Sequence, residues 1–424
     1  MTAKDVMNRT PPPSFGKEKK FDAAFRRRAF GAHFRDFTGL GRASEDLFLF
    51  VLTVSLFLHW ILAAVAVVAA SVYVLASKQR LFAALFDRGD SLFLFALLGL
   101  FALFSLFVKN WLSAVGFVGI ALFLLVAFWV RSFMTRRRFD RMLDVSLVMS
   151  FYCAIYGVID RFVFHFSSWE NYLMESSTNN ANYYGILLVF WILAAFFRLE
   201  QTGWRFRVFF YLFSVLLNFT MLLFTESISG FLALILGLLL FLFLCRRYKS
   251  FVTFLGGLGA VFCVNVLFQR SFLGGMFYIF LERVEMWRIA WRSVTENAKN
   301  LLFGQGLFSY QEIWDAAPHS FWDVRGIVPR DFQPHAHNLY LEIVLSVGFI
   351  GLILLAVYGA FQLLLLVRRA RIPELRLYSV FLFVLCAVVF VSGISDVSIF
   401  WMQSGMFFFL LCSCTAIETS PKGK

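Results

Sequence analysis

Two histidines lie close together at the end of the one long polar segment of this chain. The run His335-Ala336-His337-Asn338 leads directly into an apolar segment, residues 339–367, in a protein with only 6 histidines. Imidazole exchanges a proton near neutral pH, as a general base must. Ionisable groups at the edge of an apolar segment are candidates for function. We therefore expect proton-transfer chemistry at His335 or His337.

A structural role is equally open for this run. Asn338 or His337 can cap the following helix by accepting hydrogen bonds from its free backbone N–H groups. A metal site is only weakly supported, because the two histidines have no nearby cysteine and only Asp331 as a neighbouring carboxylate.

An amphipathic helix is predicted upstream of the histidines, over residues 276–299. Apolar side chains recur there at spacings of three and four, and charged side chains cover the remaining surface. A helix rich in Trp and Arg suits the membrane interface. Arg283 comes soon after the membrane exit, where a guanidinium can bind a diphosphate with two hydrogen bonds. For Arg292 we favour a solvated role. The apolar positions are Phe280, Val284, Trp287 and Trp291.

Two shorter polar elements interrupt the apolar segments. Residues 179–182 (NNAN) carry amides that can hydrogen-bond sugar hydroxyls or phosphates without adding charge. A turn with a helix cap explains the same residues, and we favour it for this motif alone. Residues 225–229 (TESIS) place Glu226 at a membrane edge, where a carboxylate should be paired or hydrated. Two roles are open for this break: it lines a cavity, or it only bends the helix pair on either side of it.

The elements that must position these residues are membrane helices. The chain is 60% hydrophobic and 15% charged, whereas soluble domains average about 45–50% and about 25%. Apolar runs long enough to span a bilayer recur from residue 47 onward. We therefore predict an all-α polytopic integral membrane protein with about twelve transmembrane helices.

The basic clusters set the expected topology. They lie at helix ends, so the net charge of +13 reflects the positive-inside rule rather than nucleic-acid binding. The polar segments on both sides of residues 47–76 are then cytoplasmic, so residues 47–76 must cross the membrane an even number of times. We therefore expect a hairpin near His59 and Trp60. We expect no cleavable signal peptide, so the first apolar segment should be retained in the membrane. The positions of the cysteines predict neither a zinc site nor disulfides. The expected parts are a cytoplasmic basic arm (1–44), helices 1–9 (45–268), one large helical periplasmic region (269–337), helices 10–12 (338–418) and a cytoplasmic tail (419–424).

Taken together, these elements resemble the O-antigen ligase and polymerase family of bacterial envelope glycosyltransferases. The order of the segments and the long polar region between them make the set specific. One departure concerns Ile228, which stands where many members have an arginine that holds donor phosphate, so another base must serve or the donor binds differently. The matching segments are 180–185 (NANYYG), 283–287 (RVEMW), 302–306 (LFGQG), 337–342 (HNLYLE) and 347–352 (VGFIGL).

The resemblance implies a GT-C-like fold in the bacterial inner membrane, with both termini cytoplasmic and the site facing the periplasm. The donor would be a glycan on undecaprenyl diphosphate. The acceptor would be a sugar hydroxyl of lipid A–core in a ligase, or of another lipid-linked glycan in a polymerase. His337 would take the acceptor proton and Arg283 would neutralise the leaving diphosphate, with inversion and without a metal or cofactor. Expected substrate contacts are His335, Asn338, Arg288, Asn180, Asn182, Glu226 and Ser229.

Other functions remain open at this point. Ligase and polymerase share these motifs, and transfer of glycan to protein Ser or Thr is a third variant. A transporter of lipid-linked sugars would also have about twelve helices, but it would place ionisable groups near the bilayer midplane. A non-catalytic scaffold is the remaining alternative. The partners expected besides the substrates are membrane lipids, and no nucleic acid.

Overall fold

The computed structural model describes residues 41–86, 88–107, 110–165, 173–178, 180–203, 205–257, 270–317 and 335–418. All of the elements within these ranges are helical. The chain divides into two units, Met1–Phe48 and Leu49–Lys424. Of the first unit, the described residues form the start of α3 (Gly41–Leu58). The predicted arm lies outside the described residues except for 41–44, and so does the predicted tail.

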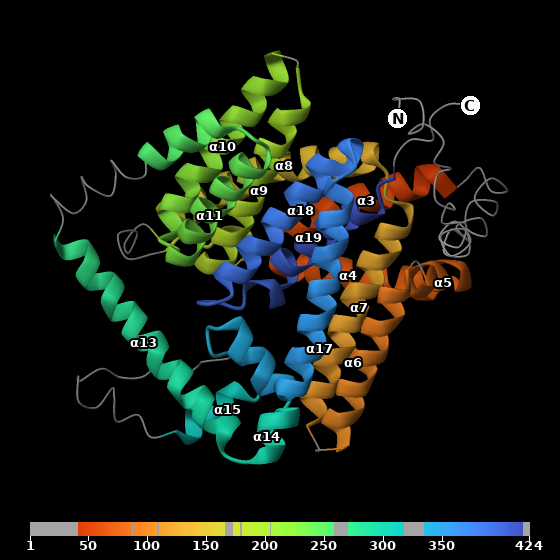
Figure 1. Cartoon of the computed structure of the whole chain (residues 1–424), viewed down its shortest axis with the longest axis vertical. Helices are drawn as coiled ribbons and strands as arrows, with labels where there is room; N and C mark the ends of the chain where they lie inside the picture. Colours follow the sequence, from red (N-terminus) through yellow and green to blue (C-terminus); the bar gives the residue numbers. More distant parts are fainter. Residues whose placement is uncertain are drawn as a thin grey trace, which may run out of the picture. The chain divides into compact units, whose positions relative to one another are not determined.

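Helices follow one another through the second unit (Figure 1). Where the connections are described, short turns join the longer helices, and the described polar region before the histidines is largely helical. The elements are α4 (Trp60–Leu75), α5 (Lys78–Phe86), α6 (Gly89–Phe107), α7 (Trp111–Phe133), α8 (Arg136–Ile159), η1 (Asp160–Phe164), η3 (Ser176–Thr178), α9 (Ala181–Gln201), α10 (Arg205–Thr225), α11 (Ile228–Leu244), α13 (Arg270–Thr295), α14 (Ala298–Phe303), α15 (Tyr310–Ala316), α17 (Leu339–Ala370), α18 (Pro373–Ser392), η4 (Ser398–Phe400), α19 (Met402–Cys412) and η5 (Ser413–Ala416).

Seven of the described helices are long and apolar enough to cross a membrane, namely α6, α7, α8 with its continuation, α9, α10, α17 and α18. α4 and α5 meet at 104° and make an eighth if they form one broken span. α11 and α19 are shorter apolar helices. The all-α membrane class is confirmed. The count of about twelve crossings stays a prediction, because one expected span falls largely on residues outside the described ranges.

Residues 47–76, expected as a hairpin, form parts of two separate helices. α3 ends at Leu58 and α4 begins at Trp60. The His59 side chain accepts a hydrogen bond from Ile61 N at 3.3 Å and so caps α4. The segment after α4 is helical over Lys78–Phe86, because it consists largely of strong helix formers.

The core of the second unit surrounds α9. In the most apolar 18-residue stretch of α9, 83% of the residues are buried. Residues 183–197 carry no charged side chain, so other helices can enclose this helix on all sides without burying a charge. α9 packs against α8, α10, α11, α18 and α19. Its first turn therefore lies among the ends of neighbouring helices.

The far end of α9 is held by a buried charge. Arg198 is 7% exposed and lies 3.0 Å from Asp140 Oδ2 and 2.9 Å from Asp144 Oδ1, both on α8. A charge buried in this way is tolerated only when it is paired, and removing one partner is strongly destabilising. The ion pairs thus fix α9 along its axis, and with it the position of its first turn.

Candidate functional site

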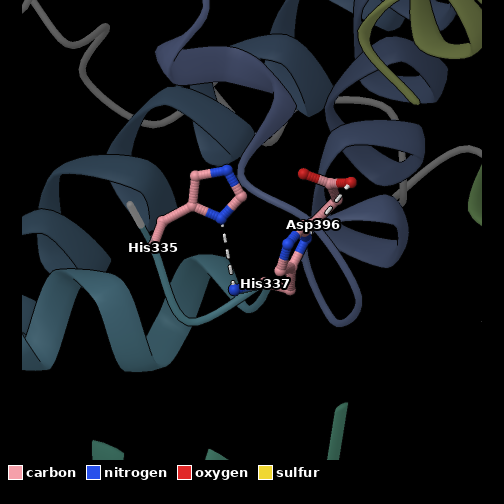
Figure 2. A group of neighbouring side chains, drawn as sticks. All are labelled: His335, His337 and Asp396. Atoms are coloured by element: carbon pink, nitrogen blue, oxygen red, sulfur yellow. Dashed lines mark hydrogen bonds and ion pairs between the residues drawn. The ribbon is translucent and has the colours of Figure 1, made fainter. Parts of the chain in front are cut away.

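His335, His337 and Asp396 form one cluster, called here the His–His–Asp cluster (Figure 2). One nitrogen or oxygen atom from each residue lies within 4.8 Å of the other two. His337 Nδ1 is 3.8 Å from Asp396 Oδ2. The two imidazole rings are 4.3 Å apart between centroids. The structure thus joins the predicted histidine pair to a carboxylate from the loop after α18.

His335 is held through both ring nitrogens. Its Nε2 lies 2.9 Å from Tyr183 Oη at the start of α9. Its Nδ1 accepts a hydrogen bond from the backbone N–H of His337 at 3.4 Å. We therefore assign the ring proton to Nε2, where it is donated to Tyr183. The Tyr183 ring is itself stacked on Trp401, with centroids 4.9 Å apart.

The ring of His337 is less constrained. Among the described residues, its Nδ1 atom has no hydrogen-bond partner. Its side chain is 20% exposed, whereas that of Asp396 is 1% exposed. Of the two histidines, His337 is therefore the one with a ring nitrogen that makes no hydrogen bond within the described part of the chain, and this nitrogen faces the buried carboxylate of Asp396.

Burial and charge keep the cluster in a mixed protonation state. Burial lowers the pKa of His335 to about 4, and the charges of His337 and Arg283 act in the same direction. Burial acts to raise the pKa of Asp396, but interaction with His337, His335 and Arg283 outweighs it and holds the pKa below its usual range. At 3.8 Å the His337–Asp396 contact is longer than a hydrogen bond, so we attribute this lowering to charge. At neutral pH a neutral His335 lies beside an ionised Asp396.

Acidification should destabilise the protein through His335. Its pKa is about 4 in the folded protein and about 6.5 in an unfolded chain, so the unfolded chain binds more protons between these values. This stability is fully present above about pH 6.5 and is lost as the pH falls toward 4, by up to about 1.4 kcal/mol per pH unit. We expect the thermal unfolding midpoint in detergent to fall between pH 7 and pH 5, and to fall less in His335→Gln. Equal pH slopes for the two proteins would contradict this account.

Asn338 is a helix cap. Its Oδ1 accepts hydrogen bonds from the N–H groups of Tyr340 and Leu341, each at 3.0 Å. Its Nδ2 donates to the carbonyl of Ile394 at 2.9 Å, and Leu339 N donates to Gly393 O at 2.7 Å. The structural interpretation of this residue is therefore correct. The same bonds tie the start of α17 to the loop that carries Asp396.

The backbone of His337 is strained and firmly held. Its φ is 47°, in the left-handed region that residues other than glycine rarely adopt. Its carbonyl accepts a hydrogen bond from Trp287 Nε1 at 3.3 Å, and Glu342 accepts one from the neighbouring Ala336 N at 3.1 Å. Strain of this kind persists only where surrounding contacts impose it, and it concentrates at functional sites.

The helix predicted over residues 276–299 is present as α13, but it buries another face. Val284 and Trp291, two of the apolar positions named from the sequence, are 38% and 47% exposed. Within the protein, α13 instead packs against α15 and α17 through other positions, and its place at the membrane interface stays a prediction. α13 ends at Thr295, and Asn297 then caps α14. The buried positions of α13 are Met286, Ile289, Ala290 and Val294.

The two arginines singled out on α13 have different surroundings. Arg288 is paired with Glu285, with Nε 2.7 Å from Oε2, and this pairing raises the pKa of Arg288. Arg283 acts electrostatically on both His335 and Asp396. The charge of Arg283 thus acts on the pKa values of the cluster, less strongly than the charges within the cluster itself, whereas the charge of Arg288 is balanced within α13.

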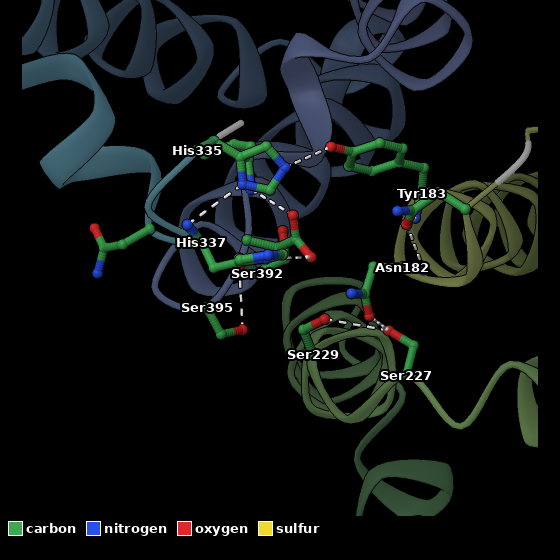
Figure 3. A network of polar contacts seen from close by, with 12 residues as sticks. Asn182, Tyr183, Ser227, Ser229, His335, His337, Ser392 and Ser395 are labelled. Atoms are coloured by element: carbon green, nitrogen blue, oxygen red, sulfur yellow. Dashed lines mark hydrogen bonds and ion pairs between the residues drawn. The ribbon is translucent and has the colours of Figure 1, made fainter. Parts of the chain in front are cut away.

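The two amide and serine motifs meet between α9 and α11 (Figure 3). Ser227 Oγ donates to Asn182 Oδ1 at 3.0 Å and lies 3.2 Å from Ser229 Oγ. Gly185 permits this approach, because a Cβ there would be 2.9 Å from Ser227 Cβ. Asn180 caps α9 by accepting from the N–H groups of Asn182 and Tyr183. Since Tyr183 contacts His335, this polar group adjoins the cluster.

The two glycine motifs also meet. α17 is kinked at Gly348, whose φ is 66° and ψ is −175°. The kink frees carbonyl groups, and the loop after α14 satisfies them: Gln305 N donates to Leu345 O at 2.6 Å and Gly306 N to Ser346 O at 3.1 Å. A Cβ at Gly304 would be 2.6 Å from Val347 N. Only glycine allows the two backbones to lie this close.

Part of the chain matches a known protein family. Residues 213–356 match the family model described as O-Antigen ligase. The chain carries an O-antigen ligase family domain. The matched region includes Arg283, His337 and both glycine motifs, and the apolar helices make the whole a multi-pass membrane protein. A comparison with curated proteins found no match.

The O-antigen ligase domain also contains the break between α10 and α11. Glu226 is exposed and has a φ of 53°. Ile228 opens α11. Arg161 contacts the residue before the break, donating from Nη1 to Phe224 O at 3.1 Å, and it is 6% exposed. A buried base therefore approaches this segment from another helix.

Sequence reasoning missed three residues of the site, namely Asp396, Tyr183 and Trp401. All three lie outside the residues matched to the O-antigen ligase family. A signal for Asp396 was present, because it is an ionisable residue between the last two apolar runs, and the rule that selected Glu226 applies to it equally. Nothing local marked Tyr183 or Trp401 as partners of a histidine.

Proposed function

We propose that this protein is an O-antigen ligase. It transfers a glycan from undecaprenyl diphosphate to a sugar hydroxyl of lipid A–core, at the periplasmic face of the inner membrane. The observation that carries the proposal is the accessible His337 beside the buried carboxylate of Asp396, inside or next to a region matched to the O-antigen ligase family. The topology and the GT-C-like fold are part of the proposal.

His337 is the proposed general base. With a proton on Nδ1 facing Asp396, the lone pair on Nε2 takes the proton of the acceptor hydroxyl. The ionised Asp396 then stabilises the imidazolium that forms. A shift of roughly 1 Å would shorten the gap between the two side chains, 3.8 Å here, to hydrogen-bond length. Catalytic contacts of this kind are often long before substrate binds.

Arg283 is the proposed ligand of the leaving diphosphate. The acceptor oxygen attacks the anomeric carbon as the bond to the diphosphate oxygen breaks, so the anomeric configuration inverts. The diphosphate leaves with the bonding electrons, and a guanidinium is well suited to its charge. The electrostatic effect of Arg283 on His335 and Asp396 supports its place near the reacting groups. Positioning and charge stabilisation suffice, so the reaction needs no metal or cofactor.

The remaining residues expected at the site divide by their contacts. Asn182 and Ser229 offer polar atoms beside the cluster and are proposed to contact sugar or phosphate. Asn180 and Asn338 act through the helices that they cap. Arg288, whose side chain is 39% exposed, and the exposed Glu226 are proposed as contacts at the periphery. His335 is proposed to orient substrate through its fixed ring. Membrane lipids surround the spans.

Asp396→Asn should lower kcat about 100-fold with little change in KM. The amide preserves shape but removes the negative charge that stabilises the His337 imidazolium, so the acid limb of the pH–rate profile should move to lower pH. Asp160→Asn is the matched control, because Asp160 pairs with His165 at 3.6 Å in a more exposed place. An unchanged pH profile in Asp396→Asn would remove this residue from the mechanism.

The function itself is tested in a strain that lacks the gene, complemented with the wild-type gene or with none. Lipopolysaccharide and lipid-linked glycan are compared on gels. A ligase predicts that capped core disappears while long chains accumulate on undecaprenyl diphosphate. Single repeat units left on core or carrier would instead indicate a polymerase of the same family. No change in either pool would overturn both.

A further inference from the structure

We infer that the His–His–Asp cluster is also a binding site for Zn2+, and that the bound ion switches off the base. The inference rests on the proposed function, because it assigns a regulatory state to the same His337. It reverses our expectation from the sequence, which considered only Asp331 as a third ligand. The structure supplies Asp396 instead.

The geometry suits one small cation. Imidazole nitrogens and carboxylate oxygens bind zinc at about 2.0–2.2 Å, so two ligands of a tetrahedral ion lie roughly 3.4 Å apart. His337 Nδ1 and Asp396 Oδ2 are 3.8 Å apart, and all three candidate atoms lie within 4.8 Å of one another. The spacing exceeds a hydrogen bond and approaches that of two atoms on one ion.

Two of the candidate atoms make no hydrogen bond. Among the described residues, His337 Nδ1 and Asp396 Oδ2 are buried without a hydrogen-bond partner. Asp396 is 1% exposed. Leaving buried polar atoms unsatisfied is costly, and an ion is one established way to satisfy them. A cation between these atoms would compensate both.

Neighbouring bonds orient the ligands as they do in metal sites. Asp396 Oδ1 accepts from Val397 N at 2.7 Å, which turns Oδ2 toward His337. His335 Nε2 is occupied by Tyr183, so Nδ1 is its ligand atom, and zinc there would replace the hydrogen bond that Nδ1 accepts from His337 N at 3.4 Å. Metal-binding histidines usually donate their other N–H in this manner. Two imidazoles and one carboxylate favour zinc over magnesium or calcium, and three protein ligands leave a fourth position open.

Binding of the ion and base catalysis exclude each other. A neutral imidazole carries one proton on its two nitrogens. When Nδ1 of His337 binds zinc, that proton must lie on Nε2, and no lone pair remains to accept the proton of the acceptor hydroxyl. We therefore expect transfer to be fastest in the presence of a chelator and to be inhibited by zinc.

Binding is measured directly on the full-length protein in detergent, freed of metal with a chelator and titrated with Zn2+ in a calorimeter. We expect one ion per chain in the wild type. Affinity should fall by about 10-fold or more in His335→Ala and in Asp396→Asn. His165→Ala is the control, because it removes a histidine outside the cluster, 3.6 Å from Asp160. Co2+ in place of zinc should give the visible absorption of a tetrahedral site, and size-exclusion profiles check folding.

The outcomes separate this inference from the proposed function. Equal zinc affinity in wild type and both cluster variants, or no binding at micromolar zinc, overturns the site. If transfer depends on His337 but the protein binds no zinc, the proposed function stands and this inference falls. Zinc bound at the cluster without any effect on transfer overturns the switch, and with it the assignment of Nε2 as the base.

Discussion

Replacing His337 by alanine is expected to lower the rate of glycan transfer about 1,000-fold and to leave the protein folded. A general base contributes roughly 100- to 10,000-fold to a rate. The contacts that hold this loop are made by the backbone of His337 and by Asn338, so they survive the change. Transfer is measured with purified protein, lipid-linked glycan donor and lipid A–core acceptor, and folding by thermal unfolding in detergent.

Two further variants make the result interpretable. His337→Asn also removes the base, but asparagine tolerates a positive φ such as the 47° found here better than alanine does. His165→Ala removes a histidine outside the site and should transfer at the wild-type rate. Added imidazole should restore part of the activity of His337→Ala, because it can replace the missing base in the vacated space. Full transfer by a folded His337→Asn protein would place the base elsewhere.

Replacing Gly348 by alanine is expected to cost several kcal/mol of stability. A Cβ on Gly348 would overlap the carbonyl group of Leu302, which belongs to the backbone and cannot move aside. The φ of 66° and ψ of −175° are also accessible essentially to glycine alone. Either the kink in α17 or its contact with the loop after α14 must break. We expect a much lower yield in membranes and a lower unfolding midpoint in detergent.

The control for this prediction lies in the same helix. Gly359 has no atom within 4 Å of the Cβ that alanine would add. Alanine is favoured over glycine in a helix interior by about 1 kcal/mol, so Gly359→Ala should be neutral or slightly stabilising. Similar losses in both variants would mean that α17 is sensitive to any substitution and that the kink has no special role.

Local patterns in the sequence were enough to predict the membrane class and the family. Apolar runs reveal helices because the length of each run is a property of contiguous residues. The short motifs around Arg283, His337 and Gly348 were recognised for the same reason, and the match over residues 213–356 bears out the resemblance.

Only the tertiary structure decided how these pieces combine. Asp396 becomes the partner of His337 because Asn338 ties the start of α17 to the loop after α18, and no spacing along the chain encodes that contact. The buried face of α13 follows from where α15 and α17 pack, not from its own periodicity. Segments that are distant in the sequence and meet at the ends of helices share no local pattern. The sequence therefore identifies the candidate residues, whereas the packing of the helices determines which residues they contact.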